Sequence, residues 1–393
     1  MENAMESLIS TAQKKILLFA NTDWYLYNFR LSLANALRDA GYDVLLLSPD
    51  GQYGPKLRAL GFRWEVAPMN RRSLNPIREI VFLCWLIRFL KIEKPQYIHS
   101  FTIKCAIYGA IAGRISKVPA IINSIAGMGY IFANDSLKAL VIRWPLRVLM
   151  SYALNRSSSI VILQNPDDVR IFADGGIVSK SRIRLIKGSG VNFDKFRQKI
   201  WDISKEKNLK VLLAARLLRD KGVTEFSQAA QMLRNEGATV EFYLAGTADC
   251  GNPAAIDERK VREWEHNGVL HWLGHVDDMP ALLQTMDVMV LPSYREGLPK
   301  GLIEGGACAL ALITTDVPGC REVVQIDGVE GLRIPPRDVI ALARAIRRLV
   351  EDRNLAMELG LAARKKALLE FSDRVVIEKT IAVYEELETS GIA

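Results

Sequence analysis

Residues 292–305 have the sequence PSYREGLPKGLIEG and directly follow a short apolar run, VMVL, at residues 288–291. A short apolar run bounded by turn residues predicts a buried strand. Gly297 and Pro299 then predict a turn, and we expect a helix to begin near Lys300 or Gly301. This order indicates a parallel α/β sheet in which the loop at the end of a strand leads straight into a helix.

The same alternation of short apolar runs and longer amphipathic stretches covers the whole chain. The strands expected in the first half are residues 15–20, 43–48, 97–99, 120–123 and 160–163. Those expected in the second half are residues 210–215, 241–245, 269–273, 288–291, 312–315 and 331–334. Repeated strand–helix–strand units predict two doubly wound, Rossmann-like α/β domains that face each other across a cleft.

The alternation pauses after residue 186 and restarts at residue 210. We therefore expect an N-terminal domain over residues 1–195 and a C-terminal domain over residues 196–372. A last helix, residues 373–393, is expected to pack back on the N-terminal domain. Gly188 and Gly190 lie in the connecting stretch and predict domain closure, because glycine allows large backbone rotations.

The composition excludes several classes of protein. Of 393 residues, 49% are hydrophobic and 24% are charged, which is typical of a globular protein and not of a collagenous or disordered one. Five cysteines without a CxxC pair argue against a disulfide scaffold or a zinc ribbon and favour a reducing cytosol. Residues 1–14 lack the pattern of a secretory signal, and no apolar run approaches the ~20 residues of a membrane span.

The charge is distributed unevenly between the two halves. Residues 1–195 hold 26 Lys and Arg against 14 Asp and Glu, whereas residues 196–393 hold 26 against 30. A basic first half predicts an anionic partner. Nucleic acid is not expected, because the sequence has no recognition helix, RNA-binding strand motif or zinc finger.

Two apolar stretches flanked by Arg and Lys, residues 71–91 and 138–156, have the composition of helices that lie in a membrane interface. Several cations near an anionic leaflet would give reversible attachment. The alternative is that both stretches are buried helices of the sheet.

Two pairs of side chains carry the predicted chemistry. Glu296 lies in the loop after the strand and Glu304 about one turn inside the following helix, so both carboxylates can accept hydrogen bonds from sugar hydroxyls. Free N–H groups at the helix start suit a diphosphate. Arg216 and Lys221, in AARLLRDKG at residues 214–222, can neutralise that diphosphate as it leaves, without a metal.

Arg216, Lys221 and the Glu296–x7–Glu304 pair, together with Gly190 and Gly246, resemble the retaining GT-B glycosyltransferases of family 4. The first half is similar to bacterial enzymes that extend polyprenyl-diphosphate-linked saccharides, including N-acetylgalactosaminyl transferases. The stretches that carry this similarity are NFR (residues 28–30), HSFTIKCAIYG (99–109) and NSIAGMGYIF (123–132).

The resemblance implies a role for each matching residue. Arg216 and Lys221 would hold the diphosphate of the donor, Glu304 its ribose and Glu296 its sugar, with configuration retained and no metal or protein nucleophile. The implied donor-binding set is Arg216, Lys221, Gly246, Glu296, Gly297, Leu298, Pro299, Lys300 and Glu304. The implied catalytic set is Glu296, Arg216, Lys221 and His99, and the implied acceptor set is His99, Lys104 and Arg30.

His99 departs from the pattern of many members, which carry a second histidine where this chain has Phe101. Its alternative is a histidine whose hydrogen bonds are satisfied at the end of a strand. His271 and His275 have the spacing of a zinc pair on a helix, but HWLGH predicts a strand and a turn, which argues against a metal site.

The implied function is transfer of a sugar, an N-acetylhexosamine, from a UDP-sugar to a polyprenyl-diphosphate-linked saccharide in bacterial lipopolysaccharide, polysaccharide or glycan assembly. Such a protein would be cytoplasmic and attached peripherally to the inner face of the plasma membrane. Two alternatives stay open: a non-catalytic sugar-nucleotide-binding partner of a membrane assembly complex, and a sugar-nucleotide 2-epimerase.

Overall fold

The computed structural model describes residues 13–71, 73, 75–126, 137–155, 159–203, 208–249 and 252–389, with side chains of the helix at 137–155 described from residue 144 onward. Residues 1–12, which belong to the stretch without a secretory-signal pattern, and residues 127–132 of the NSIAGMGYIF stretch lie outside the described residues. The chain forms two compact units. Unit 1 comprises Met1–Leu163, Val169–Leu185 and Ile377–Ala393, and unit 2 comprises Gln164–Asp168 and Ile186–Val376.

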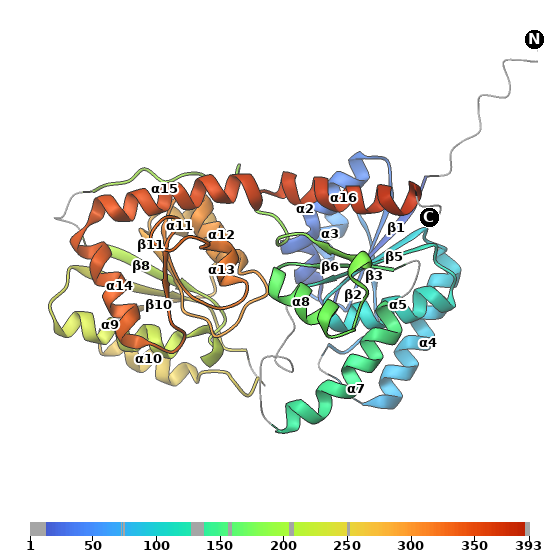
Figure 1. The fold of residues 1–393 in the computed structure, drawn as a ribbon, viewed down its shortest axis with the longest axis horizontal. Coiled ribbons are helices and arrows are strands. Elements are labelled where there is room, and N and C mark those ends of the chain that lie inside the picture. The colour runs from blue at the N-terminus through green and yellow to red at the C-terminus, as the bar shows by residue number, and fades with distance from the viewer. Residues whose placement is uncertain are drawn as a thin grey trace, which may run out of the picture. The chain divides into compact units, whose positions relative to one another are not determined.

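Unit 1 contains a seven-stranded parallel sheet in the order β3-β2-β1-β4-β5-β6-β7 (Figure 1). Its strands are β1 (Lys15–Phe19), β2 (Asp43–Ser48), β3 (Arg63–Val66), β4 (Tyr97–Phe101), β5 (Ala120–Ile125), β6 (Ser159–Leu163) and β7 (Ile183–Leu185). The sequence pattern does not predict β3 and β7, because these short edge strands include exposed and polar residues. The central strands β4, β5 and β6 are buried throughout, as expected for a parallel sheet that is covered on both faces.

A side-chain cap marks the start of α4 in unit 1. Asn75 accepts hydrogen bonds from the N–H groups of Ile77 and Arg78, and Pro76 occupies the first helical position of α4. The helices described here are α1 (Asp23–Tyr25), the π-helical turn η1 (Leu26–Arg30), α2 (Leu31–Asp39), α3 (Gly54–Ala59), α4 (Pro76–Glu93), α5 (Ile103–Ile115), α7 (Leu137–Leu154), α8 (Pro166–Asp174), η2 (Lys180–Arg182) and α16 (Asp373–Thr389). The first residues of α8 and of α16 belong to unit 2.

Unit 2 repeats the plan with a six-stranded parallel sheet in the order β10-β9-β8-β11-β12-β13. Its strands are β8 (Leu209–Ala214), β9 (Val240–Ala245), β10 (His271–Gly274), β11 (Val288–Leu291), β12 (Ala311–Thr315) and β13 (Leu332–Ile334). Its helices are η3 (Arg219–Lys221), α9 (Val223–Asn235), α10 (Glu258–His266), α11 (Met279–Gln284), α12 (Lys300–Ala307), α13 (Cys320–Val323), α14 (Val339–Glu351) and α15 (Arg353–Glu370). Both sheets thus have the strand order of a Rossmann fold.

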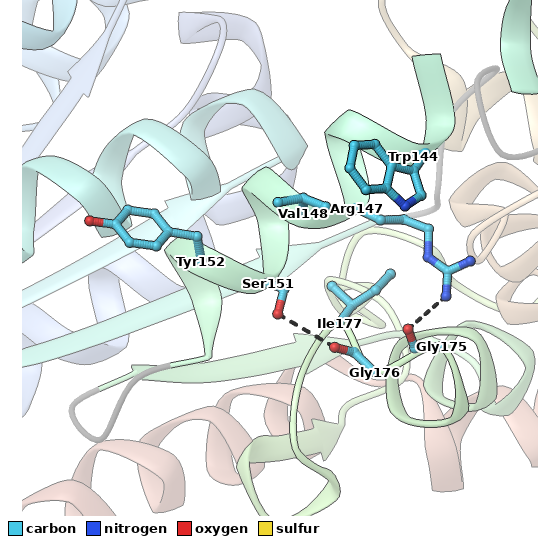
Figure 2. A pocket seen from close by; sticks show the side chains of 8 residues that line it. All are labelled: Trp144, Arg147, Val148, Ser151, Tyr152, Gly175, Gly176 and Ile177. Atoms are coloured by element: carbon cyan, nitrogen blue, oxygen red, sulfur yellow. Dashed lines mark hydrogen bonds between the residues drawn. The ribbon is translucent and has the colours of Figure 1, made fainter. Parts of the chain in front are cut away.

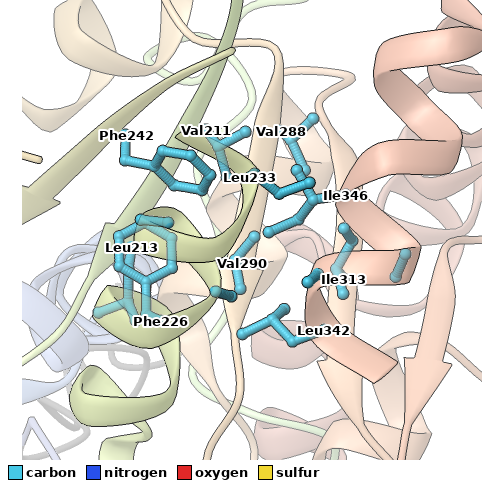
Figure 3. Packing of buried hydrophobic residues seen from close by; sticks show 14 of the residues in the cluster. Val211, Leu213, Phe226, Leu233, Phe242, Val288, Val290, Ile313, Leu342 and Ile346 are labelled. Carbon is cyan, nitrogen blue, oxygen red and sulfur yellow. The ribbon is translucent and has the colours of Figure 1, made fainter. Parts of the chain in front are cut away.

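Alternate strand residues of unit 2 fill two separate cores. Val211 and Leu213 of β8 pack in the core shown in Figure 3, together with Phe226 of α9 and Ile346 of α14. Leu212 lies between them in sequence and packs in the other core, against α12. Side chains of a strand alternate between the two faces of its sheet, and the central strands β11 and β12 are buried at every residue. The sheet is therefore a rigid base for the loops at its edge.

Among the described residues, no helix combines the length and the apolar character needed to span a membrane.

Candidate functional site

The strand order of unit 2 reverses between β8 and β11, which lie next to each other in the sheet. Ligands of open α/β sheets bind outside the carboxyl ends of the strands at such a switch point. Residues 215–222 follow β8 and residues 292–299 follow β11. The two loops that the sequence analysis singles out therefore leave the sheet next to each other.

Lys221 and Glu296 form an ion pair between these loops. The Nζ atom of Lys221 lies 2.5 Å from Oε1 of Glu296, and their side chains are only 18% and 13% exposed. Partial burial strengthens the attraction, because less water screens the charges. Two of the predicted catalytic residues are thus in direct contact.

The backbone around this pair needs glycine. Gly222 follows Lys221 with a φ of 73°, and a Cβ atom there would lie 2.2 Å from the carbonyl oxygen of Pro292. The Tyr294 N–H donates to the carbonyl of Asp220 over 2.9 Å and joins the same two loops. Only a residue without a side chain lets the loop after β8 approach the loop after β11 so closely.

Glu304 lies on α12, the helix that the second loop enters. Burial raises the pKa of its carboxyl group to about 7, and Lys300, whose Nζ atom lies 3.9 Å away, acts in the opposite direction. The side chain is 16% exposed. Burial removes the water that would otherwise stabilise the ionised carboxylate. Hydrogen bonds from hydroxyl groups would replace that water and stabilise the ionised form.

The start of α12 carries unused hydrogen-bond donors. Pro299 is its N-cap residue and makes no capping hydrogen bond through its side chain. Within the part of the chain that the structure describes, no acceptor is found for the backbone N–H groups of Gly297 and Leu298. Free N–H groups at a helix start attract anions.

Arg216 belongs to the same loop as Lys221 but pairs differently. Its guanidinium bonds Oδ2 of Asp249 over 2.7 Å, and its side chain is 61% exposed. Gly246, which follows β9, has a φ of 142°, and a Cβ atom there would lie 1.9 Å from the carbonyl oxygen of Ala215. Gly246 therefore allows the loop after β9 to approach the Arg216 loop.

Sequence analysis missed three residues next to the site. Asp249 orients Arg216, Gly319 lies against the carbonyl oxygens of Glu296 and Gly297, and Asn165 donates to the carbonyl of Gly297. The N-P-D-D stretch that starts at Asn165 does signal a helix start. No local pattern relates these residues to a loop so distant in sequence.

His99 of unit 1 is fully buried, and both of its ring nitrogens have partners. Nδ1 lies 2.6 Å from the hydroxyl of Tyr384 and Nε2 lies 2.7 Å from the hydroxyl of Ser124. Burial, and secondly the charge of Arg30, hold the histidine pKa well below its usual range, so the ring is neutral. Contact between His99 and a substrate stays a prediction, and it would require one of these bonds to open.

Lys104 is the second residue predicted to bind the glycosyl acceptor. The ammonium of Lys104 donates to the carbonyls of Asn70 and Ser73 and to Oε1 of Glu79. Three acceptors use all three of its protons. Contact between Lys104 and the lipid-linked substrate stays a prediction, and it would also require existing hydrogen bonds to open.

Arg30 is 4% exposed at the end of the π-helical turn after β1. It donates to the Tyr25 hydroxyl over 3.0 Å and stacks over the ring of Phe101 at 4.3 Å. Its buried Nε atom has no hydrogen-bond partner, and no carboxylate of the described residues pairs with it. A buried cation without a counter-ion indicates a place for an anion.

Unit 1 also has a surface pocket of about 590 Å³ beside α7 (Figure 2). Trp144, Val148 and Ile177 provide apolar walls, and the guanidinium of Arg147 is held by the carbonyl of Gly175 at 2.6 Å. The full lining is Trp144, Arg147, Val148, Ser151, Tyr152, Gly175, Gly176 and Ile177.

Within the described ranges, no group of three or more His, Cys, Asp or Glu side chains is placed to hold a metal ion. His271 stacks against Tyr243, and Nε2 of His275 lies 3.3 Å from Asp277. The two histidines therefore have separate partners.

Two family models match the chain. The model described as glycosyl transferases group 1 matches residues 208–352, and the one described as glycosyl transferase 4-like matches residues 15–165. A Campylobacter jejuni relative, N,N'-diacetylbacillosaminyl-diphospho-undecaprenol alpha-1,3-N-acetylgalactosaminyltransferase, is 28% identical over 92% of this chain and 96% of its own. An Escherichia coli relative, UDP-Gal:alpha-D-GlcNAc-diphosphoundecaprenol alpha-1,3-galactosyltransferase, is 25% identical over 73% of this chain and 75% of its own.

Solved structures share the fold. HepE from Anabaena in complex with UDP and glucose covers 95% of this chain and 99% of its own, with a TM-score of 0.76 and 19% identity. Sucrose-phosphate synthase from Thermosynechococcus elongatus covers 96% and 100%, with a TM-score of 0.77 and 19% identity. The prediction of two doubly wound Rossmann-like domains of the GT-B type is confirmed.

Proposed function

We propose that this chain, which belongs to the group 1 and 4-like glycosyltransferases, is a sugar transferase of bacterial surface-glycan assembly. It would transfer an N-acetylhexosamine from a UDP-sugar to a polyprenyl-diphosphate-linked saccharide. The observation that carries this proposal is the Lys221–Glu296 ion pair at the switch point of unit 2, together with Glu304 on the helix that follows the Glu296 loop. The Campylobacter relative, whose name describes transfer of N-acetylgalactosamine to an undecaprenyl-diphosphate-linked sugar, supports the choice of acceptor and of sugar.

The donor would bind to unit 2. Lys221 and Arg216 would hold its diphosphate together with the free N–H groups before α12, and Glu304 would accept hydrogen bonds from the ribose hydroxyls. Glu296 would contact the sugar beside Lys221. The UDP found with HepE supports a uridine nucleotide.

The reaction would retain the configuration at the anomeric carbon. The bond from this carbon to the β-phosphate oxygen breaks, and the acceptor hydroxyl oxygen forms a new bond on the same face. The hydroxyl proton passes to the departing phosphate oxygen. Lys221 stabilises the negative charge on that phosphate, so neither a metal nor a protein nucleophile is needed.

On the acceptor side, Arg30 is the best placed of the three candidates. Its guanidinium is buried and pairs with no carboxylate of the residues that the structure describes, whereas Lys104 and His99 already bond to neighbours in unit 1. Arg30 follows β1 and contacts Phe101 at the end of β4, where the strand order of unit 1 reverses. We infer that Arg30 takes the diphosphate of the lipid-linked acceptor.

The lipid tail of that acceptor calls for a membrane surface. Helix α4 buries Phe82, Leu86 and Leu90 and leaves Ile77 and Ile80 74% and 61% exposed, so it is both a core helix and an apolar surface. Further exposed apolar side chains are Val81, Ile92, Trp144, Val148, Leu149 and Tyr152. Arg147, at the pocket of Figure 2, adds positive charge among them. This face would attach the protein peripherally to the anionic inner leaflet of the plasma membrane.

Product formation by the purified protein tests the proposal. The protein would be incubated with UDP-N-acetylgalactosamine, UDP-N-acetylglucosamine or UDP-glucose and a short-chain polyprenyl-diphosphate-linked N-acetylhexosamine. We expect one extended lipid-linked product, formed equally well in EDTA. UDP binding without any product would favour the non-catalytic partner, and conversion of the UDP-sugar without an acceptor would favour the epimerase.

A further inference from the structure

The side chain of Asn165 makes three hydrogen bonds beside the donor loop. This residue is fully buried, and its Oδ1 accepts the N–H of Asp168 over 2.8 Å. Its Nδ2 donates to Oδ2 of Asp168 over 2.9 Å and to the carbonyl oxygen of Gly297 over 2.7 Å. Both segments belong to unit 2, because Gln164–Asp168 is part of it.

Asp168 provides a second anchor for the same loop. Its Oδ1 lies 3.3 Å from Nη2 of Arg295, and its side chain is nearly fully buried. Burial raises the pKa of this carboxyl group, while the bonds from Asn165 and Arg295 oppose the rise. Arg295 comes directly before Glu296 and Gly297 directly after it, so the loop is held on both sides of Glu296.

The bond from Asn165 also sets the direction of a backbone donor. In a trans peptide the C=O and N–H groups point in opposite directions. With the Gly297 carbonyl on Asn165, the N–H of Leu298 points away from Asn165. Among the described residues this N–H has no acceptor, so it can donate a hydrogen bond to a ligand.

We propose that Asn165, supported by Asp168, is a positioning residue that fixes Glu296 and the Leu298 N–H for the sugar-diphosphate donor. This inference rests on the proposed function, because it requires the donor to bind at the Glu296 loop. Asn165 does not touch the donor and acts through Gly297. A fixed loop spares the donor the entropic cost of ordering the loop on binding.

A helix cap is the simpler role that must be separated from this one, since Oδ1 of Asn165 accepts an N–H group in the first turn of α8. Serine is about as good an N-cap as asparagine, but it has no amide to donate. Asn165→Ser therefore keeps a capping oxygen and removes the bond to Gly297. Asn75→Ser is the matched control, because Asn75 caps α4 in unit 1 with the same kind of bond.

The experiment measures UDP affinity, and the KM values for UDP-sugar and for acceptor, in full-length protein. We expect Asn165→Ser to weaken UDP and UDP-sugar binding about five- to tenfold, the effect of one lost hydrogen bond, without changing the acceptor KM. Asn75→Ser should leave the donor constants unchanged. Asp168→Asn keeps the side-chain volume but loses its charge opposite Arg295, and we expect a smaller rise in the donor KM of about threefold.

The inference would be overturned if both Asn165→Ser and Asp168→Asn left the UDP affinity and the KM for UDP-sugar unchanged. A lower melting temperature together with a lower kcat at constant donor KM would also overturn it, because this combination reports a structural cap alone. If Asn165→Ser does not fold, Asp168→Asn decides by the same criteria. Wild-type protein that binds no nucleoside diphosphate would contradict the proposed function instead, so the two failures are distinguishable.

Discussion

Nζ of Lys221 lies 2.5 Å from Oε1 of Glu296, and the two residues come from loops that follow different strands of one sheet. Each charge neutralises the other in the absence of a ligand. A donor diphosphate would compete with Glu296 for the lysine, and the sugar hydroxyls would then bond the released carboxylate. The proposed reaction would therefore separate the two groups of this pair.

Lys221→Ala is expected to lower kcat for UDP-sugar turnover by about 100-fold or more, because the departing diphosphate loses a preorganised positive charge. Steady-state assays of product formation measure the effect. Lys365→Ala is the control, since Lys365 is exposed in the same unit. Turnover within twofold of wild type in Lys221→Ala would contradict the assigned role, provided that its melting temperature shows a folded protein.

Glu304 predicts a dependence of stability on pH. Its pKa is about 7 in the folded protein, above its ordinary value of 4.5, so the folded state binds more protons than the unfolded state between these values. The free energy of unfolding should fall as pH rises through this window, by at most roughly 3 kcal/mol, and the loss should be complete above pH 7. Urea unfolding at pH 5 and pH 8 measures it.

Glu304→Gln is the comparison, because it removes the ionisation and should lose less stability between these pH values. Equal losses in both proteins would refute the prediction. UDP binding should also strengthen as pH rises through about 7, because ribose hydroxyls donate to the ionised carboxylate. Calorimetry in buffers of different ionisation enthalpy should then show proton release from wild-type protein and less from Glu304→Gln.

Gly319→Ala should disturb the donor loop through a steric clash. Gly319 has a φ of 79°, and an added Cβ atom would lie 2.5 Å from the carbonyl oxygen of Gly297 and 2.6 Å from that of Glu296. Gly328 has the same φ but nothing within 4 Å of an added Cβ atom, so Gly328→Ala controls for backbone strain alone. We expect a donor KM several-fold higher in Gly319→Ala than in Gly328→Ala, and similar values in both would rule the clash out.

The membrane proposal predicts that a charge on the exposed face of α4 weakens attachment. Ile80→Asp should reduce co-sedimentation with vesicles of 30% anionic lipid, since it removes apolar area and adds repulsion. Ile200, 95% exposed in unit 2, provides the control substitution Ile200→Asp. Equal loss in both variants, or no binding of wild-type protein to any vesicle, would contradict the assigned face.

The sequence by itself determined the fold class, because short, mostly apolar strands alternate with longer amphipathic helices, and both patterns are local. It also determined that Glu296 precedes a helix that contains Glu304, since the turn residues Gly297 and Pro299 act locally. It did not determine β3 or β7, because these short edge strands are only partly buried and lack a run of apolar residues.

Only the tertiary structure decided which side chains meet. Lys221 and Glu296 are 75 positions apart, and Asn165 and Gly297 are 132 apart. Such contacts depend on strand order and on glycines that permit close approach, and neither leaves a periodic signal in the chain. The hydrogen-bond partners of Lys104 and His99, which are also distant in sequence, were decided in the same way. So was the division of the apolar residues of α4 between the core and an exposed face.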